Sequence, residues 1–285
     1  MILSIKLNLK GRFRAVGKVI FSSLFIVFMM SANQVISQGT SEKYNAEIIE
    51  CASDMIHQRM LMEDQGYRQR HETMERSIES QSIHSEDQRM VIYTIPVVVH
   101  IIHTGENIGT GANITDAQVQ SAINALNEDY RRMQGTNGFG AGVDCEIEFC
   151  LASRDPQGNP TNGIMRVNGS SVTNYATQGM SVGQGSGASE TAVKDLSRWD
   201  RDDYYNIWIV NEIEDNDGGA GIQGFAYFPS SSANRDGAVI LYNAFGTVGN
   251  LKSYTALNRT TSHELGHAFS LYHTFQGNSC TESNC

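Results

Sequence analysis

Three histidines and one glutamate near the end of the chain have the types and the spacing of a metal site. His263 and His267 are four residues apart, so an α-helix would place both imidazoles on one face, with Glu264 beside them. His273 follows ten residues after His263, too far along a straight helix to meet the same ion. The chain must therefore leave the helix after about Phe269 and turn back through a residue that tolerates a positive φ. Three imidazoles would hold Zn²⁺ and leave one position for water.

The motif HExxHxxxxxH and the segment after it, 271–275, resemble the zinc motif of the metzincin peptidases, specifically of the pappalysin family with its ulilysin-like and cytophagalysin-like members. A more moderate resemblance lies in residues 95–102 and 236–240. The resemblance implies an α+β fold with a twisted, mixed five-stranded sheet. A helix would back this sheet, and an active-site helix would carry the zinc ligands below the cleft.

Two features depart from the family pattern. Ser270 stands where the family has glycine, and a non-glycine residue in a left-handed turn costs about 1 kcal/mol. The family also has a methionine-containing turn beneath the metal, whereas the twelve residues after His273 contain no methionine. We therefore expect the sequence to be a C-terminally truncated piece of a longer protein, without the C-terminal subdomain of its catalytic domain.

The resemblance implies a secreted zinc-dependent endopeptidase that acts on proteins or peptides. His263, His267 and His273 would bind Zn²⁺, and Glu264 would be the general base that takes a proton from a zinc-activated water. One alternative is a catalytically impaired, zinc-binding secreted protein that serves binding or adhesion. Another is a zinc hydrolase that acts on non-peptide substrates. The intact Glu264 counts against the first alternative, because a pure binding protein needs no base there.

The N-terminal region is typical of a secretory signal peptide. Residues 1–40 contain five basic residues and no acidic one, and an apolar run extends over 19–32. This run is short for a membrane span of about 20 residues, so we expect cleavage after residue 37, an extracellular location and no membrane association afterwards. The net charge of -10 argues against nucleic-acid binding.

Residues 38–90 are expected to form a prosegment that is later removed. They are rich in Glu, Gln, Arg, Met and His and lack β-branched runs, which favours helix and linker over sheet. Their only cysteine is Cys51, and a prosegment thiolate can fill the position that water needs on zinc. The resemblance supports this zymogen switch, with an unpaired thiol awaiting a partner as the alternative. His57, His71 and His84 lack ligand spacing, so we expect them to be solvated.

Five cysteines fit an oxidising compartment, in which disulfide bonds form. Cys145 and Cys150 would lie about 16 Å apart in an extended strand, beyond disulfide reach, and can pair only if the chain bends between them. Cys280 and Cys285 could pair with each other or with cysteines outside this sequence.

The catalytic domain is expected over residues 91–285. The expected strands cover residues 92–103, 146–152, 204–213, 221–228 and 238–242. The expected helices cover residues 115–133 and 190–199 and a zinc helix that begins near 258–261. Residues 115–118 form a capping box, and the first strand, helix and strand predict a parallel crossover. By the resemblance, the strand within 221–228 is an antiparallel edge to which a substrate peptide could add as an extra strand.

Three further features are given structural roles. His100 and His103 lie on opposite faces of their expected strand, so they are not expected to share a metal. Residues 178–189 are rich in Gly and Ser and are expected to form a surface loop. The oxygen-bearing residues in 215–219 make calcium conceivable, but the rest of an EF-hand loop is missing, so a plain turn is expected.

Overall fold

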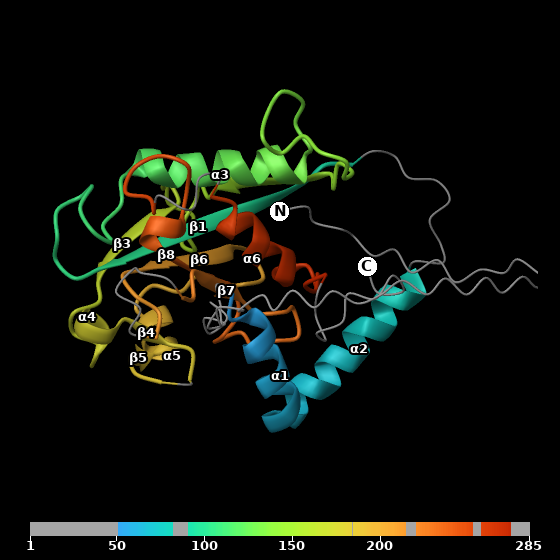
Figure 1. The fold of residues 1–285 in the computed structure, drawn as a ribbon, viewed down its shortest axis with the longest axis horizontal. Helices are drawn as coiled ribbons and strands as arrows, with labels where there is room; N and C mark the ends of the chain where they lie inside the picture. Colours follow the sequence, from blue (N-terminus) through green and yellow to red (C-terminus); the bar gives the residue numbers. More distant parts are fainter. Residues whose placement is uncertain (1–50, 82–90, 184, 215–220, 253–257, 275–285) are drawn as a thin grey trace, which may run out of the picture. The chain divides into compact units, whose positions relative to one another are not determined.

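The computed structural model describes residues 51–81, 91–183, 185–214, 221–252 and 258–274 (Figure 1). All of these residues belong to the larger of the two compact units of the chain. The expected signal peptide, the 215–219 turn, His84, Cys280 and Cys285 lie outside the described residues. Within the described part, no helix has both the length and the apolar character needed to cross a membrane.

A mixed sheet forms the centre of the described part, as the resemblance implies. Its strands are β1 Tyr93–His103, β2 Ile147–Leu151, β3 Ile164–Asn168, β6 Tyr205–Val210, β7 Gly224–Ala226 and β8 Ala238–Leu241. The strand order is β2-β1-β6-β8-β7, and β3 also pairs with β1. Every pair is parallel except β7 with β8, which is antiparallel, so the expected antiparallel edge strand is confirmed.

The sheet has six strands among the described residues, one more than the five expected, because β1 is long enough to pair with two strands along one side. Residues 93–97 of β1 pair with β2, and residues 99–103 pair with β3. The opposite side of β1 pairs with β6 over residues 97–101. Since β2 and β3 follow one another along the same side, the sheet is still five positions wide. The sequence analysis missed β3, a half-buried strand without a clear alternation of apolar residues.

The helices α3 Asp116–Tyr130 and α6 Thr260–Ala268 pack on the sheet and on each other. The backing helix α3 packs against β2, and α6 packs against β7, β8 and α3 (Figure 1). Their apolar side chains join those of β1, β6 and β8 in one core. Met133, expected on the apolar face of the backing helix, lies beyond its end and is exposed.

Four short elements follow β3: α4 Tyr175–Gln178, β4 Met180–Ser181, β5 Ala188–Ser189 and α5 Glu190–Lys194. Strands β4 and β5 lie within 178–189, for which composition predicted a surface loop, whereas α5 is the helix expected over 190–199 and ends at Lys194. Met180, Val182 and Ala188 in this segment are buried in the core, so the expectation of a surface loop over 178–189 was wrong. These few apolar residues stand among many glycines and serines, so the composition of the segment did not indicate that they are buried. A 3-10 turn, η1 Tyr242–Ala244, follows β8.

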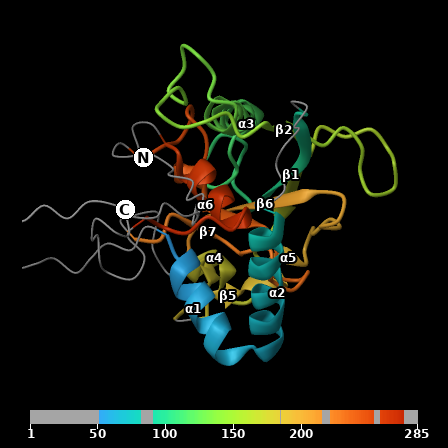
Figure 2. The same ribbon diagram turned by 90° about the vertical axis from the view of Figure 1, so that its right-hand side faces the viewer.

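The N-terminal helix pair consists of α1 Ser53–Glu63 and α2 Gln65–Gln81, which meet at Asp64 (Figure 2). Both elements are helical, as the composition of residues 38–90 predicted. The first of them contacts β7, the edge strand of the sheet. The N-terminal helix pair is therefore packed at the strand to which a substrate was expected to add.

Half of the expected capping box forms at the start of α3. The Thr115 hydroxyl accepts a hydrogen bond from the backbone N–H of Gln118 at 3.2 Å. The Gln118 amide does not bond back to the cap but donates to the carbonyls of Tyr242 and Phe245, both at 2.9 Å. It thereby ties the start of α3 to the chain that follows β8.

Loss of this cap should destabilise the protein measurably. We expect Thr115→Ala to lower the free energy of unfolding by about 1 kcal/mol, because one N–H at the helix start loses its acceptor. Thr115→Ser keeps the hydroxyl and is the matched control, expected to remain close to the wild type. Urea unfolding followed by circular dichroism measures both, and equal stability of the alanine and serine variants would contradict the role of the cap.

Candidate metal centre

The end of α6 makes the chain reversal that the histidine spacing requires. The helix ends at Ala268, and Ser270 adopts a left-handed conformation with φ of 64°. The N–H of Leu271 donates to the Gly266 carbonyl, and the N–H of Ser270 donates to the His267 carbonyl, both at 2.9 Å. These two bonds form a Schellman motif, the usual way to end a helix and redirect the chain. The turn brings the following residues back towards the helix face that carries the histidines.

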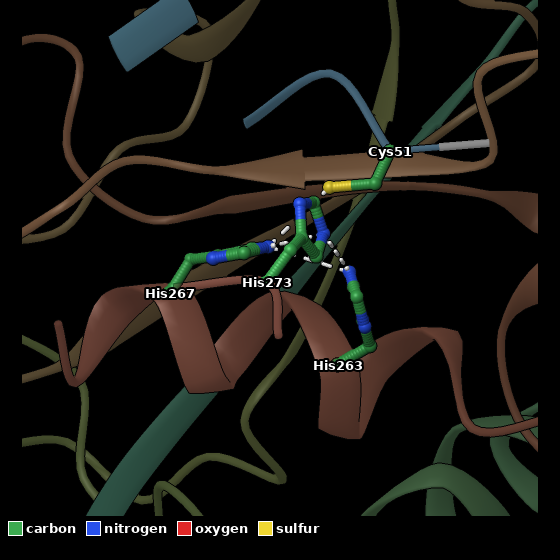
Figure 3. Close-up of side chains that lie close together, drawn as sticks. All are labelled: Cys51, His263, His267 and His273. Atoms are coloured by element: carbon green, nitrogen blue, oxygen red, sulfur yellow. Dashed lines mark hydrogen bonds between the residues drawn. The ribbon is translucent and has the colours of Figure 1, made fainter. Parts of the chain in front are cut away.

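The three histidines of the motif meet at one point (Figure 3). The Nε2 atom of His273 lies 2.8 Å from Nε2 of His263 and 3.2 Å from Nε2 of His267. The Nε2 atoms of His263 and His267 are 3.3 Å apart. Four ligands around zinc at about 2.0 to 2.1 Å would place neighbouring nitrogens about 3.3 Å apart, close to this arrangement.

Hydrogen bonds at the outer nitrogens fix the protonation of two of these rings. Nδ1 of His267 faces the Leu271 carbonyl at 2.7 Å, and Nδ1 of His273 faces the Asp54 carboxylate at 2.6 Å. Since both partners are acceptors, both Nδ1 atoms must carry the proton. Each Nε2 therefore presents a lone pair towards the same point. Converging lone pairs repel unless a cation lies between them, so these residues fit a metal ion.

His263 and His267 are also held in the neutral form that metal binding needs. Burial, together with the neighbouring imidazoles, lowers the pKa of His263 to about 3 and that of His267 to about 4. A neutral imidazole keeps its lone pair at ordinary pH and is the common form of a histidine ligand. The site is thus poor in protons and ready to accept a divalent ion.

Cys51 supplies a fourth candidate ligand from outside the motif. Its Sγ atom lies 3.4 Å from Nε2 of His267, and the ligand atoms of Cys51 and the three histidines all fall within 4.8 Å of one another. Burial, and next the nearby Glu264 carboxylate, raises the pKa of the thiol well above its ordinary value. A divalent cation reverses this effect on a coordinated thiol, which it deprotonates. Nitrogen and sulfur donors in this number are typical of zinc.

Glu264 lies beside the cluster and is fully buried. Burial raises the pKa of its carboxyl group to about 8, opposed by hydrogen bonds from Ser53 and Cys51. The Ser53 hydroxyl donates to Oε2 at 3.0 Å. Gly224 on β7 passes so close that a Cβ atom there would lie 3.1 Å from Cγ of Glu264. A glycine at this place lets the edge strand approach the carboxylate.

The N-terminal helix pair contributes buried histidines that sequence reasoning placed in solvent. His57 is 3% exposed and His71 is 8% exposed, so that expectation was wrong. The His57 ring packs on Phe228 with centroids 4.4 Å apart, and Nε2 of His71 lies 3.0 Å from the Tyr272 hydroxyl. Tyr67, His71 and Met74 are spaced to lie on one face of a helix, and this spacing could have indicated that His71 is buried.

Other sequence expectations fall outside the cluster. His100 is buried, bonds Asn206 at 2.9 Å and lies away from the metal ligands, in keeping with a structural role. Cys145 and Cys150 are both free thiols, as is Cys51, so the described residues contain no disulfide bond. The chain does turn at Glu146, with φ of 56°, but β2 then runs extended past Cys150, and the two thiols remain unpaired.

Comparisons with known proteins agree with the geometry. The family model Peptidase_M43, described as pregnancy-associated plasma protein-A, matches residues 187–285. An extracellular metalloprotease of Pyricularia oryzae is 30% identical over 194 residues, which cover 66% of this chain and 53% of that protein. This chain spans about half the length of the curated relatives it matches.

Two solved structures are similar in fold. A promirolysin mutant of Tannerella forsythia is 32% identical, with a TM-score of 0.59 over 79% of this chain and 70% of that one. Mature mirolysin of Tannerella forsythia, in complex with a cleaved peptide, is 34% identical, with a TM-score of 0.52 over 66% of this chain and 68% of that one. The fold is that of a metzincin metallopeptidase. Within that class, the chain belongs to the pappalysin-type Peptidase_M43 family.

The left-handed serine after α6 should cost stability. We expect Ser270→Gly to raise the free energy of unfolding by about 1 kcal/mol, because glycine adopts a positive φ without steric strain. The serine hydroxyl also contacts Sδ of Met74 at 3.4 Å, so Ser270→Ala, which keeps the Cβ atom and loses the hydroxyl, is the matched control. Urea unfolding compares the two variants, and a glycine variant no more stable than the alanine variant would refute the strain.

Proposed function

We propose that this chain is the latent form of a secreted zinc-dependent endopeptidase. The observation that carries the proposal is the convergence of the Nε2 atoms of three histidines next to a fully buried glutamate. His263, His267 and His273 would hold the zinc ion, and Glu264 would act as the base. The extracellular location is supported by the names of the fungal relatives and by the expected signal peptide.

The zinc ion, when bound, would polarise a peptide carbonyl and lower the pKa of a water molecule. Glu264 would take the proton of the attacking water and return it to the leaving amine. Gly224 would keep the edge strand close to the reacting bond.

The edge of β7 would bind the substrate backbone. This strand pairs with β8 on one side only. On its other side, the carbonyl of Gly224 and the N–H of Ala226 form hydrogen bonds with residues 51–53. After removal of the prosegment, an extended peptide could bond to the same groups irrespective of its sequence. Protein and peptide substrates fit such an edge better than small esters do.

Three consecutive residues of the prosegment, 51–53, support latency through four contacts. Cys51 would occupy the ligand position that the attacking water needs. The Ser53 hydroxyl donates to Glu264 at 3.0 Å and accepts from the N–H of Ala226 at 3.0 Å. Ala52 donates to the Gly224 carbonyl at 3.2 Å. The base and the substrate edge are thus both engaged by the prosegment.

One comparison separates metal binding from chemistry. We expect Glu264→Ala to keep one zinc per chain and to lose proteolysis by a factor of about 10² to 10⁴, because only the base is removed. His267→Ala should lose the zinc itself. Zinc is measured by mass spectrometry, and activity on casein is measured after the prosegment has been removed.

The other outcomes of this comparison select the alternatives. Zinc in the wild type without cleavage of any unfolded protein would indicate a binding or adhesion protein. Cleavage of small esters and amides but not of proteins would indicate a non-peptide hydrolase. Stoichiometric zinc in His267→Ala would exclude this cluster as the metal site.

The thiol contact predicts partial activation on its removal. We expect unprocessed Cys51→Ser protein to be more active than unprocessed wild type, yet less active than processed protein, because Ser53 still engages Glu264 and β7. Cys150→Ser removes an exposed thiol elsewhere and is the control, expected to stay latent. Unprocessed Cys51→Ser protein with the low activity of the wild type would refute a role for the thiol in latency.

A further inference from the structure

Asp54, in the first turn of α1, contacts the metal site from outside. Its Oδ2 atom accepts a hydrogen bond from Nδ1 of His273 at 2.6 Å. A carboxylate oxygen therefore faces the outer nitrogen of the third histidine.

Two of the three outer nitrogens have hydrogen-bond partners, and these partners come from different parts of the chain. Nδ1 of His267 donates to the carbonyl of Leu271, in the turn that follows its own helix. Nδ1 of His273 donates to a residue 219 positions away, in the predicted prosegment. Nδ1 of His263 is buried without a hydrogen-bond partner among the described residues. The metal site is thus partly built by a segment that a mature enzyme would lack.

A carboxylate that accepts a hydrogen bond from the outer nitrogen of a metal-binding histidine affects both the ring and the metal. It fixes the tautomer and the orientation of the ring and raises the basicity of the ligating nitrogen, and its loss typically costs 10-fold to 100-fold in metal affinity. His273 needs such help, because it lies on the chain after the helix has ended and not on the rigid helix itself. Asp54 is itself held in place, since it follows Ser53, whose hydroxyl is bonded on both sides.

We propose that Asp54 is a positioning residue of the metal site, so that the prosegment completes the site it blocks. The latent chain would then bind zinc more tightly than the processed chain does. By linkage, bound zinc would hold the prosegment more tightly in return. The proposal rests on the proposed zymogen function. It adds that residues 51–54, which would exclude water from the metal, also help to retain the metal.

The test compares zinc affinity in the full, unprocessed chain. We expect Asp54→Ala to weaken zinc binding about 10-fold to 100-fold in competition with a chromogenic chelator. Asp54→Asn keeps an acceptor for Nδ1 without the charge and should lie between Asp54→Ala and the wild type. Glu63→Gln removes an exposed carboxylate from the same helix and should leave the affinity unchanged.

A spectroscopic measurement on the zinc-free protein distinguishes positioning from a general loosening of the helix. Nitrogen-15 shifts of the His273 ring should show a proton on Nδ1 in the wild type and in Asp54→Asn, and a mixture of tautomers in Asp54→Ala. Unchanged zinc affinity or an unchanged His273 tautomer in Asp54→Ala would overturn the proposal.

The same effect must survive removal of the thiol. In a Cys51→Ser background, Asp54→Ala should still weaken zinc binding, because Asp54 acts through His273. If the effect vanished there, Asp54 would act only by placing Cys51, and the proposal would be wrong. A wild-type chain that binds no zinc would instead refute the proposed function itself.

Discussion

The organisation of this site depends on a single chain reversal at the end of α6. Two histidines one turn apart on a helix can share an ion, but a third from the same segment can reach it only if the chain doubles back within a few residues. The Schellman bonds at Ser270 and Leu271 produce that reversal, at the cost of a left-handed serine. The surrounding core holds α6 against β7 and α3, so the turn that follows α6 begins from a fixed position.

Burial creates the chemical character of the site, and hydrogen bonds direct it. Burial lowers the pKa of His263 and His267 and raises that of Glu264, so imidazole lone pairs and a protonatable carboxyl group lie side by side. The acceptors at Nδ1 then decide which nitrogen of His267 and His273 faces inward. Because one of these acceptors belongs to the N-terminal helix pair, the electrostatics of the site are shared between two segments far apart in the sequence.

The spacing of residues anticipated the local features of the fold well. The helix with its end near Phe269, the positive φ after it, the cap at Thr115 and the parallel crossover all follow from short-range rules. The family resemblance supplied the antiparallel edge strand, which no periodicity indicates. Strand β3 and the buried residues of 180–188 were missed, because their burial depends on tertiary neighbours and not on pattern. The burial of His57 and His71 was missed for the same reason, since it needs Phe228 and Tyr272 on the opposite surface.

The attachment of the N-terminal helix pair bears on how latency would end. Contacts of residues 51–54, His57 and His71 hold the pair, and residues 82–92 connect α2 to β1. This tether keeps the pair at a high effective concentration beside the cleft. A single cut between α2 and β1 would leave the contacts of residues 51–54 and His71 in place, but it would turn an intramolecular association into one that dilution can dissociate. Activation would then lag behind cleavage and proceed faster at low protein concentration than at high.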